Sequence, residues 1–159
     1  MFVSRDEEWV TIQRVCKDLE KYSITPVNGL IINVSPDYSS TVSLHIAHHL
    51  SSDGEMMTII PVDVPYPDED AGPYRDEFIK KLPLFNKPKL VLVEAGVITG
   101  GNYTFMKDVL ENIPGKEVIT VAQYENIHSK FQCDVVGRYY NWDKVQLEFY
   151  WERENKHWK

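Results

Sequence analysis

The sequence predicts an α/β fold in which helices cover both faces of a mostly parallel central sheet. Short apolar runs of strand type alternate along the chain with segments of helical periodicity. One such run, Lys89 to Glu94, is apolar at consecutive positions, which is typical of a central parallel strand covered on both faces. The predicted order is helix, strand, helix, strand, long loop, strand, helix, strand, strand, and this alternation favours a parallel sheet.

The first half of the chain contains two predicted helices and two predicted strands. Residues 5–22 form the first helix, because apolar residues recur there at helical spacing and Ser4 with Glu7 matches a capping box. The elements that follow are a strand at 29–34, a turn at 35–38, a helix at 39–50 and a strand at 57–62.

A long acidic loop, rich in proline, interrupts this pattern at about residues 63–88. Loops of this length inside a domain usually act as lids or binding loops. Acids far outnumber the single Arg75 over residues 63–77, which favours a solvated loop, and a short helix is expected at 75–81. The pattern then resumes with a strand at 89–94, a helix at 103–112 and strands at 117–122, 133–137 and 145–151.

Composition limits the classes of function. The 159 residues suit one domain, residues 1–159, and the formal net charge of -7 argues against nonspecific nucleic-acid binding, which needs a basic face. Cys16 and Cys133 are too few for a disulfide framework or a structural zinc site. The chain shows no signal segment, and no run approaches the roughly 18 apolar residues of a membrane span. We therefore expect a cytoplasmic protein without a membrane partner.

The turn after residues 89–94 has the composition of an anion-binding site. Ligands bind beyond the carboxyl ends of parallel strands, and here Thr99-Gly100-Gly101-Asn102 opens the next helix. Glycines let several N–H groups point inward, and a helix N-terminus favours an anion. A plain strand-to-helix turn can have the same composition, so the turn alone leaves both interpretations open.

The chain as a whole resembles the type I phosphoribosyltransferases, and most of all their xanthine/guanine branch. That family carries an apolar strand, two adjacent acids, two apolar residues, a third acid and Thr-Gly-Gly-Thr, and Leu90 to Asn102 has the same spacing. The late segments Val118–Ala122, Asp134–Gly137 and Phe149–Glu152 are also similar to those of the branch. The resemblance implies transfer of a phosphoribosyl group from phosphoribosyl pyrophosphate to a purine-type base, with Mg²⁺ as cofactor if the protein is active. Members of the family are commonly dimers, which implies a homodimer.

The resemblance also assigns roles to residues. Glu94 is implied to hold the ribose, as the surviving catalytic acid, and the loop at Ser35, Pro36 and Asp37 to face the pyrophosphate. The family often has a cis peptide in this loop, and a proline at position 36 lowers the cost of a cis bond after Ser35, so the resemblance implies that this bond is cis. The implied phosphate-binding residues are Thr99, Gly100, Gly101, Asn102 and Thr104, and the implied base-binding residues are Gln123, Gln146, Phe149 and Trp151.

Several of these positions depart from the family pattern. The second acid is Ala95 and the third is Ile98, which cannot accept a proton. Asp37 opposes a pyrophosphate electrostatically. Glutamine replaces the base-reading lysine at Gln123 and the stacking tryptophan at Gln146; an aromatic platform contributes about 1–3 kcal/mol per base, so purine affinity should fall.

Three interpretations therefore remain: a divergent transferase, a catalytically inactive nucleotide- or phosphate-binding module with a regulatory or interaction role, and a structural domain. Nucleoside monophosphate binding without turnover would favour the second. His45 and His49 have the i, i+4 spacing of a metal pair, but solvent-facing histidines are the more common case and we expect no metal site. The aromatic-rich end includes Tyr139, Tyr140 and Trp142. These residues could form a base-binding hood, or they could pack in the core or at a dimer interface.

Overall fold

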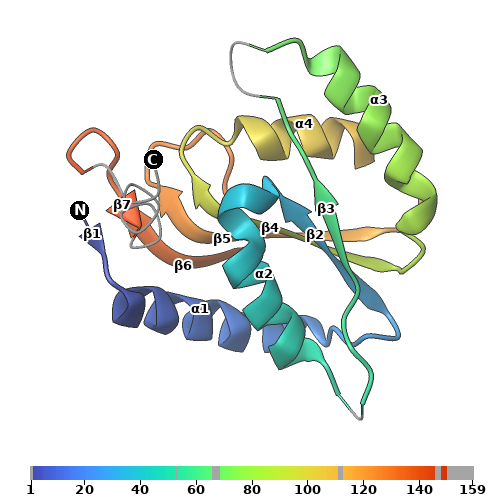
Figure 1. The fold of residues 1–159 in the computed structure, drawn as a ribbon, viewed down its shortest axis with the longest axis horizontal. Helices are drawn as coiled ribbons and strands as arrows, with labels where there is room; N and C mark the ends of the chain where they lie inside the picture. The colour runs from blue at the N-terminus through green and yellow to red at the C-terminus, as the bar shows by residue number, and fades with distance from the viewer. Residues whose placement is uncertain (1, 53, 66–68, 111–112, 146–147, 150–159) are drawn as a thin grey trace, which may run out of the picture.

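The chain forms a parallel sheet whose strands alternate with helices (Figure 1). The computed structural model describes residues 2–52, 54–65, 69–110, 113–145 and 148–149. The elements are β1 (Phe2–Val3), α1 (Arg5–Leu19), η1 (Glu20–Tyr22), β2 (Gly29–Val34), α2 (Pro36–Leu50), β3 (Ile59–Val62), α3 (Ala71–Lys81), η2 (Leu82–Leu84), β4 (Lys89–Val97), α4 (Gly101–Leu110), β5 (Glu117–Asn126), β6 (Val135–Tyr140) and β7 (Glu148–Phe149).

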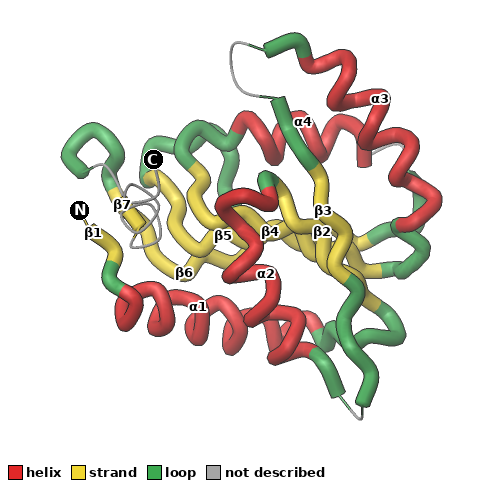
Figure 2. Tube along the Cα trace, viewed as in Figure 1, coloured by secondary structure: helices red, strands yellow, loops and turns green. Residues whose placement is uncertain are grey.

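Five of these strands form the central sheet in the order β3-β2-β4-β5-β6, and every neighbouring pair is parallel. Helices α1 and α2 lie on one face and α3 and α4 on the other, as Figure 2 shows. The predicted fold class, an α/β fold with helices on both faces of a mostly parallel sheet, is confirmed. None of the described helices is long and apolar enough to cross a lipid bilayer.

Strand β4 lies at the centre of the sheet and separates two apolar cores. Val91 and Val93 pack into the core below α1 and α2, whereas Leu90 and Leu92 pack into the core below α3 and α4. All four side chains are fully buried. This explains why the strand is apolar at consecutive positions, and it fixes the carboxyl end of β4 at the middle of the sheet edge where ligands bind in such folds.

The turn predicted at 35–38 is mostly the first turn of α2, which begins at Pro36 rather than at residue 39. Proline suits the first helical position because its missing N–H has no intrahelical acceptor there. The described residues contain no cis peptide bond, so the predicted cis bond between Ser35 and Pro36 is wrong. Ser35 instead has a left-handed backbone, with φ 52° and ψ 70°, and this conformation turns the chain into the helix.

The loop predicted at 63–88 contains a longer helix than expected, since α3 begins at Ala71 and not at residue 75. The Asp70 side chain accepts a hydrogen bond from the Gly72 N–H (2.9 Å) and caps the helix. Phe78 is the buried anchor of α3 and packs against Phe85, with ring centroids 5.5 Å apart.

The sequence did not reveal β1, a two-residue strand that pairs in parallel with β7 through Phe2 with Glu148 and Val3 with Phe149. Two residues are too few to show a periodicity. Of the final strand predicted at 145–151, only residues 148–149 are described as strand; 146–147 and 150–151 lie outside the described residues.

Candidate functional site

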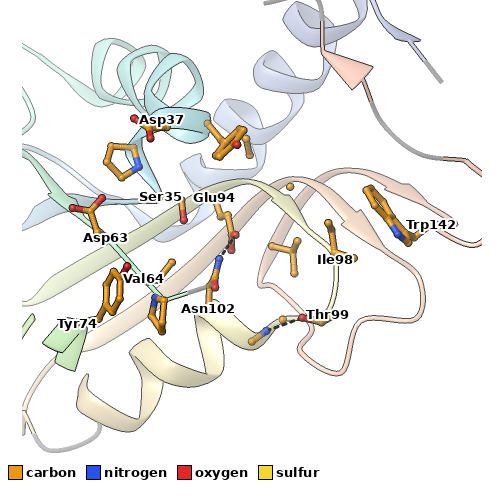
Figure 3. Close-up of a pocket in the computed structure, with 18 of the residues that line it drawn as sticks. Ser35, Asp37, Asp63, Val64, Tyr74, Glu94, Ile98, Thr99, Asn102 and Trp142 are labelled. Carbon is orange, nitrogen blue, oxygen red and sulfur yellow. Dashed lines mark hydrogen bonds between the residues drawn. The ribbon is translucent and has the colours of Figure 1, made fainter. Parts of the chain in front are cut away.

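A pocket of about 650 Å³ lies at the carboxyl edge of the sheet (Figure 3). Strand ends and helix starts that are distant in sequence meet there, as the parallel topology requires. The residues that line it come from four segments: Ser35 to Tyr38, Asp63 to Pro65 with Tyr74, Glu94 to Asn102, and Tyr140 with Trp142. The structure thus brings together the predicted pyrophosphate loop, Glu94 and the predicted phosphate turn.

The phosphate turn, Thr99 to Asn102, has a backbone that only glycine can adopt at its centre. Gly100 has φ +82°, and a Cβ atom there would lie 2.3 Å from the Phe131 Cβ. The amides of Asn102 and Tyr103 belong to the first turn of α4, where no intrahelical acceptor exists. The turn therefore presents N–H groups and the positive end of a helix dipole to the pocket.

Thr104 lies outside this lining. Its hydroxyl donates to the Gly100 carbonyl (3.1 Å), as does its own N–H (3.0 Å). The predicted phosphate ligand is therefore a residue that shapes the turn from behind.

Glu94 lies at the floor of the pocket and is only 8 % exposed. Its Oε1 accepts a hydrogen bond of 2.7 Å from Asn102 Nδ2, so the carboxyl group is tied to the phosphate turn (Figure 3). Burial raises the pKa of Glu94 to about 7, and the Asn102 hydrogen bond opposes part of that rise. The group is consequently divided between its neutral and ionised forms near pH 7.

The backbone next to Glu94 is fixed by α2. Ser39 Oγ accepts a hydrogen bond from the Ala95 N–H (3.0 Å), and both residues are buried. Asn33 at the end of β2 holds the same helix, donating to Ser40 Oγ (3.1 Å) and accepting from Ser43 Oγ (3.0 Å). This buried polar network sets the spacing between the pyrophosphate loop and the floor of the pocket.

The predicted pyrophosphate loop has few amides to offer a ligand. The Ser35 N–H donates to the Val62 carbonyl (3.1 Å), and the N–H groups of Tyr38 and Ser39 donate to the Ser35 carbonyl (3.0 and 3.2 Å). Pro36 has no N–H. Asp37 also lines the pocket at this loop and adds a carboxyl group. The loop therefore differs from the phosphate turn both in its paired amides and in its acidic side chain.

Charge in the pocket is entirely negative as far as the structure describes it. Asp37, Asp63 and Glu94 contribute carboxyl groups, and no lysine, arginine or histidine belongs to the described lining. The carboxyl groups also do not fit a metal centre built by the protein, since no set of three potential ligand side chains comes together in the described part of the chain. Ala95 and Ile98, which stand where the resemblance implies two further acids, add no carboxyl group to this part of the pocket.

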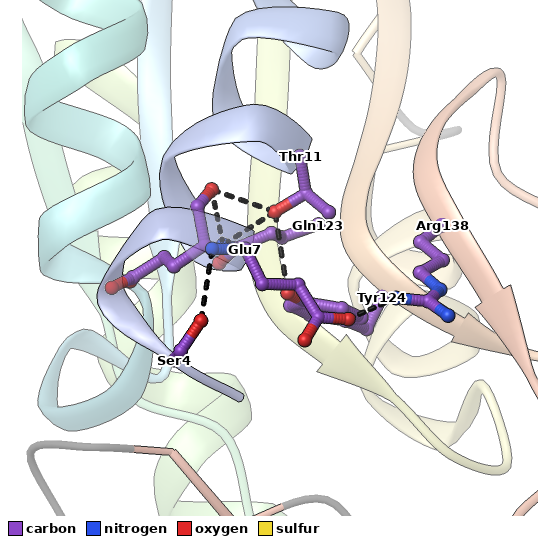
Figure 4. A network of polar contacts seen from close by, with 7 residues as sticks. Ser4, Glu7, Thr11, Gln123, Tyr124 and Arg138 are labelled. Atoms are coloured by element: carbon purple, nitrogen blue, oxygen red, sulfur yellow. Dashed lines mark hydrogen bonds and ion pairs between the residues drawn. The ribbon is translucent and has the colours of Figure 1, made fainter. Parts of the chain in front are cut away.

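Of the predicted base-binding residues, Gln123 is the one whose side chain the structure describes, and it does not line this pocket. Gln123 is fully buried and its Nε2 donates to Thr11 Oγ1 (3.1 Å) in the network that joins β5 to α1, so its amide has no access to the pocket (Figure 4). Gln146 and Trp151 lie outside the described residues. Phe149 pairs with Val3 through its backbone.

Aromatic residues of the pocket come instead from the end of β6 and the residues after it. Tyr140 and Trp142 both line the cavity, and their rings meet edge to face with centroids 6.0 Å apart. The sequence analysis had left open whether this aromatic-rich segment is a base-binding hood or packs in the core or at an interface. Asp63 and Tyr74 were also missed as lining residues; Asp63 directly follows β3, so the rule that parallel strands end at one edge could have identified it.

Comparisons with known proteins support the fold. The chain superposes on Helicobacter pylori xanthine-guanine-hypoxanthine phosphoribosyltransferase with a TM-score of 0.70 and 12% identity, covering 99% of this chain and 96% of that one. A purine phosphoribosyltransferase from Pyrococcus horikoshii superposes with a TM-score of 0.69 and 15% identity, covering 96% of this chain and 93% of that one. A Neisseria gonorrhoeae protein with bound ppGpp gives 0.69 and 12%, with coverage of 99% and 94%.

No protein-family model matches the sequence, and no curated protein matches it either. The three structures named above nevertheless match over 96–99% of this chain. The chain has the fold of the type I phosphoribosyltransferases, and its relatives in structure include purine enzymes of that fold.

Proposed function

We propose that this protein binds a purine nucleotide through its 5′-phosphate and does not transfer phosphoribosyl groups. The observation that carries the proposal is the contrast between the two loops of the pocket. In the turn Thr99 to Asn102 the Gly101 N–H makes a long bond to a side chain, Thr99 Oγ1 (3.3 Å), and the Asn102 amide lies in the first turn of α4. In the other loop the amides of Ser35, Tyr38 and Ser39 all donate to main-chain carbonyls.

The pocket accommodates the three parts of a nucleotide in a simple order. The 5′-phosphate is bound by the amides at the start of α4. The ribose lies over Glu94, whose carboxyl group can accept hydrogen bonds from hydroxyl groups. The base is directed toward Trp142, because an aromatic face provides a platform for any base.

Transfer chemistry is disfavoured by the other half of the pocket. A pyrophosphate bound there would face Asp37 and Asp63 without a described cation to offset them. Two unit charges 4 Å apart interact by about 1 kcal/mol in water and about 4 kcal/mol near a protein surface, so each close carboxylate weakens pyrophosphate binding appreciably. Ile98, at the position of the family's third acid, supplies no proton acceptor.

The structural relatives agree with a purine nucleotide as the ligand class. Two are purine phosphoribosyltransferases, and the gonococcal protein has ppGpp bound. Since these likenesses are at 12–15% identity, they support the proposal through the shared fold only.

Calorimetric titration tests the proposal with guanosine monophosphate, ppGpp and phosphoribosyl pyrophosphate, the last with and without Mg²⁺. We expect binding of the monophosphate and weaker or no binding of phosphoribosyl pyrophosphate. The absence of detectable binding for both guanosine monophosphate and ppGpp would refute the proposal.

Two glycine substitutions, one in the phosphate turn and one outside it, provide a test and its matched control for this titration. Gly100→Ala should abolish nucleotide binding, because the new methyl group meets Phe131 and deforms the turn. Gly115→Ala introduces a Cβ at a similar positive φ (+76°) but into open space, so it should lower stability alone. Equal loss of binding in both variants would mean that the effect is global and not local to the turn.

The transferase remains the second candidate, because Glu94 and the phosphate turn, to which the resemblance assigns the ribose and the phosphate, line the same pocket. Tight binding of phosphoribosyl pyrophosphate that depends on Mg²⁺, followed by release of pyrophosphate when a purine base is added, would favour it over the binding module.

A further inference from the structure

Asn126, the last residue of β5, joins the two ends of the pocket through its side chain. The residue is 8 % exposed, and its Nδ2 donates to the Ile98 carbonyl (3.1 Å). Its Oδ1 accepts from the Trp142 N–H (3.2 Å) and, more weakly, from the His128 N–H (3.4 Å). Ile98 directly precedes the phosphate turn, and Trp142 belongs to the aromatic wall, so one carboxamide contacts both.

The residues that follow Asn126 support the phosphate turn from behind. The Lys130 N–H donates to the Thr99 carbonyl (3.2 Å). Phe131 blocks the space beside Gly100, and its ring packs on Tyr103 of α4 with centroids 5.2 Å apart. The turn therefore rests on a segment that begins at Asn126.

We propose that Asn126 is a positioning residue that holds the phosphate turn and the Trp142 segment together as one preorganised unit. The ligand-binding part of this inference rests on the nucleotide binding proposed above. Removing the carboxamide leaves a carbonyl and two amides without their partners in a mostly buried place, which is more costly than the loss of an exposed hydrogen bond. A site that is rigid before binding spends less of its interaction energy on ordering, so loosening it lowers affinity at both ends.

Hydrogen exchange on the ligand-free protein tests the coupling without any ligand. In Asn126→Ala, amide exchange should quicken both at residues 99–103 and at Trp142. In Asn126→Asp, the acceptor oxygen remains but the donor to Ile98 is lost, so residues 99–103 should quicken while Trp142 stays protected. Asn28→Ala is the matched control, because that carboxamide also joins two backbone groups, accepting from the Thr25 N–H (2.8 Å) and donating to the Ser23 carbonyl (3.0 Å), and it lies before β2, away from the pocket lining.

Titrations with inorganic phosphate, guanosine and guanosine monophosphate then probe each end separately. Asn126→Ala should raise the dissociation constant of guanosine monophosphate about tenfold, the equivalent of about one or two hydrogen bonds. It should also raise the dissociation constants of inorganic phosphate and guanosine. A purely structural role would lower the melting temperature and leave the affinity of the folded protein unchanged.

In Asn126→Ala, amide exchange that changes at only one of the two segments, or at neither, would overturn the inference. So would a loss of affinity confined to phosphate or to guanosine in Asn126→Ala. If the wild-type protein binds no nucleotide, the proposed function fails, while the exchange experiment still decides the role of Asn126.

Discussion

Replacing Glu94 by glutamine should stabilise the protein at alkaline pH and weaken its binding of nucleotide. Glu94 is buried below the pocket, and burial raises its pKa to about 7 from the usual 4.5. The folded protein therefore holds a proton that the unfolded chain releases between about pH 4.5 and pH 7. Because the folded state binds more protons in this range, stability must fall as pH rises through it and reach its full loss above about pH 7.

The size of this effect follows from the shift of the pKa. One pKa unit corresponds to about 1.4 kcal/mol, so the rise from 4.5 to about 7 destabilises the ionised folded protein by at most about 3.5 kcal/mol. Glutamine has nearly the same shape, carries no charge and can keep the hydrogen bond from Asn102 through its Oε1. Glu94→Gln should therefore match the wild type at pH 5 and exceed its free energy of unfolding at pH 8.5.

Urea unfolding followed by circular dichroism between pH 5 and pH 8.5 measures this difference. Glu8 provides an internal comparison, because burial against β5 also raises its pKa to about 7. Glu8→Gln should remove a separate part of the pH dependence and leave nucleotide binding intact, whereas Glu94→Gln should remove its part and weaken binding. If Glu94→Gln shows no gain in stability at pH 8.5 relative to pH 5, the carboxyl group is not desolvated and the reasoning is wrong.

Three further predictions concern the walls of the pocket. Trp142→Ala should reduce the free energy of binding of guanosine monophosphate by about 1–3 kcal/mol, as calorimetry would measure. Trp9→Ala, on the outer face of α1, should leave that binding unchanged. Asp37→Asn should strengthen the binding of phosphoribosyl pyrophosphate relative to that of guanosine monophosphate, because it removes one carboxylate from the predicted pyrophosphate loop. An unchanged ratio of the two dissociation constants would contradict this. Ser39→Ala leaves the buried Ala95 N–H without its acceptor and should lower the free energy of unfolding by about 1–3 kcal/mol, as urea denaturation would measure.

The elements of the fold were predictable where the local pattern carried the information. The strand at 29–34 was predicted with the bounds that the structure gives, because its apolar run is closed by Gly29 at one end and by the turn at Ser35 at the other. The start of α3 was not, because its position depends on which acid of an acidic segment caps the helix, and only the contact between Asp70 and Gly72 decides this.

The site was predictable at its backbone but not at its aromatic wall. The phosphate turn and Glu94 belong to one contiguous motif, so their proximity follows from the strand-to-helix connection itself. Gln123 was expected to face the base from its alignment with a lysine of the family. The direction of a strand side chain changes with every residue, however, and in this structure Gln123 points to Thr11. The position of Trp142 depends on how far β6 extends, which composition does not fix.

The two loops of the pocket show why a sequence motif alone cannot decide whether such a site still works. A loop binds phosphate with its backbone amides, and an amide is lost to the ligand either by proline or by an internal hydrogen bond. Both occur at Ser35–Ser39, where the left-handed Ser35 brings its carbonyl under the amides of Tyr38 and Ser39. At the other loop, the Gly101 N–H donates to Thr99 Oγ1 (3.3 Å), and the amides of Asn102 and Tyr103 lie in the first turn of α4 beyond the positive φ of Gly100. The loop at Ser35–Ser39 is therefore poorer in available amides than its length suggests, and this backbone difference comes in addition to the replacement of acidic side chains at Ala95 and Ile98.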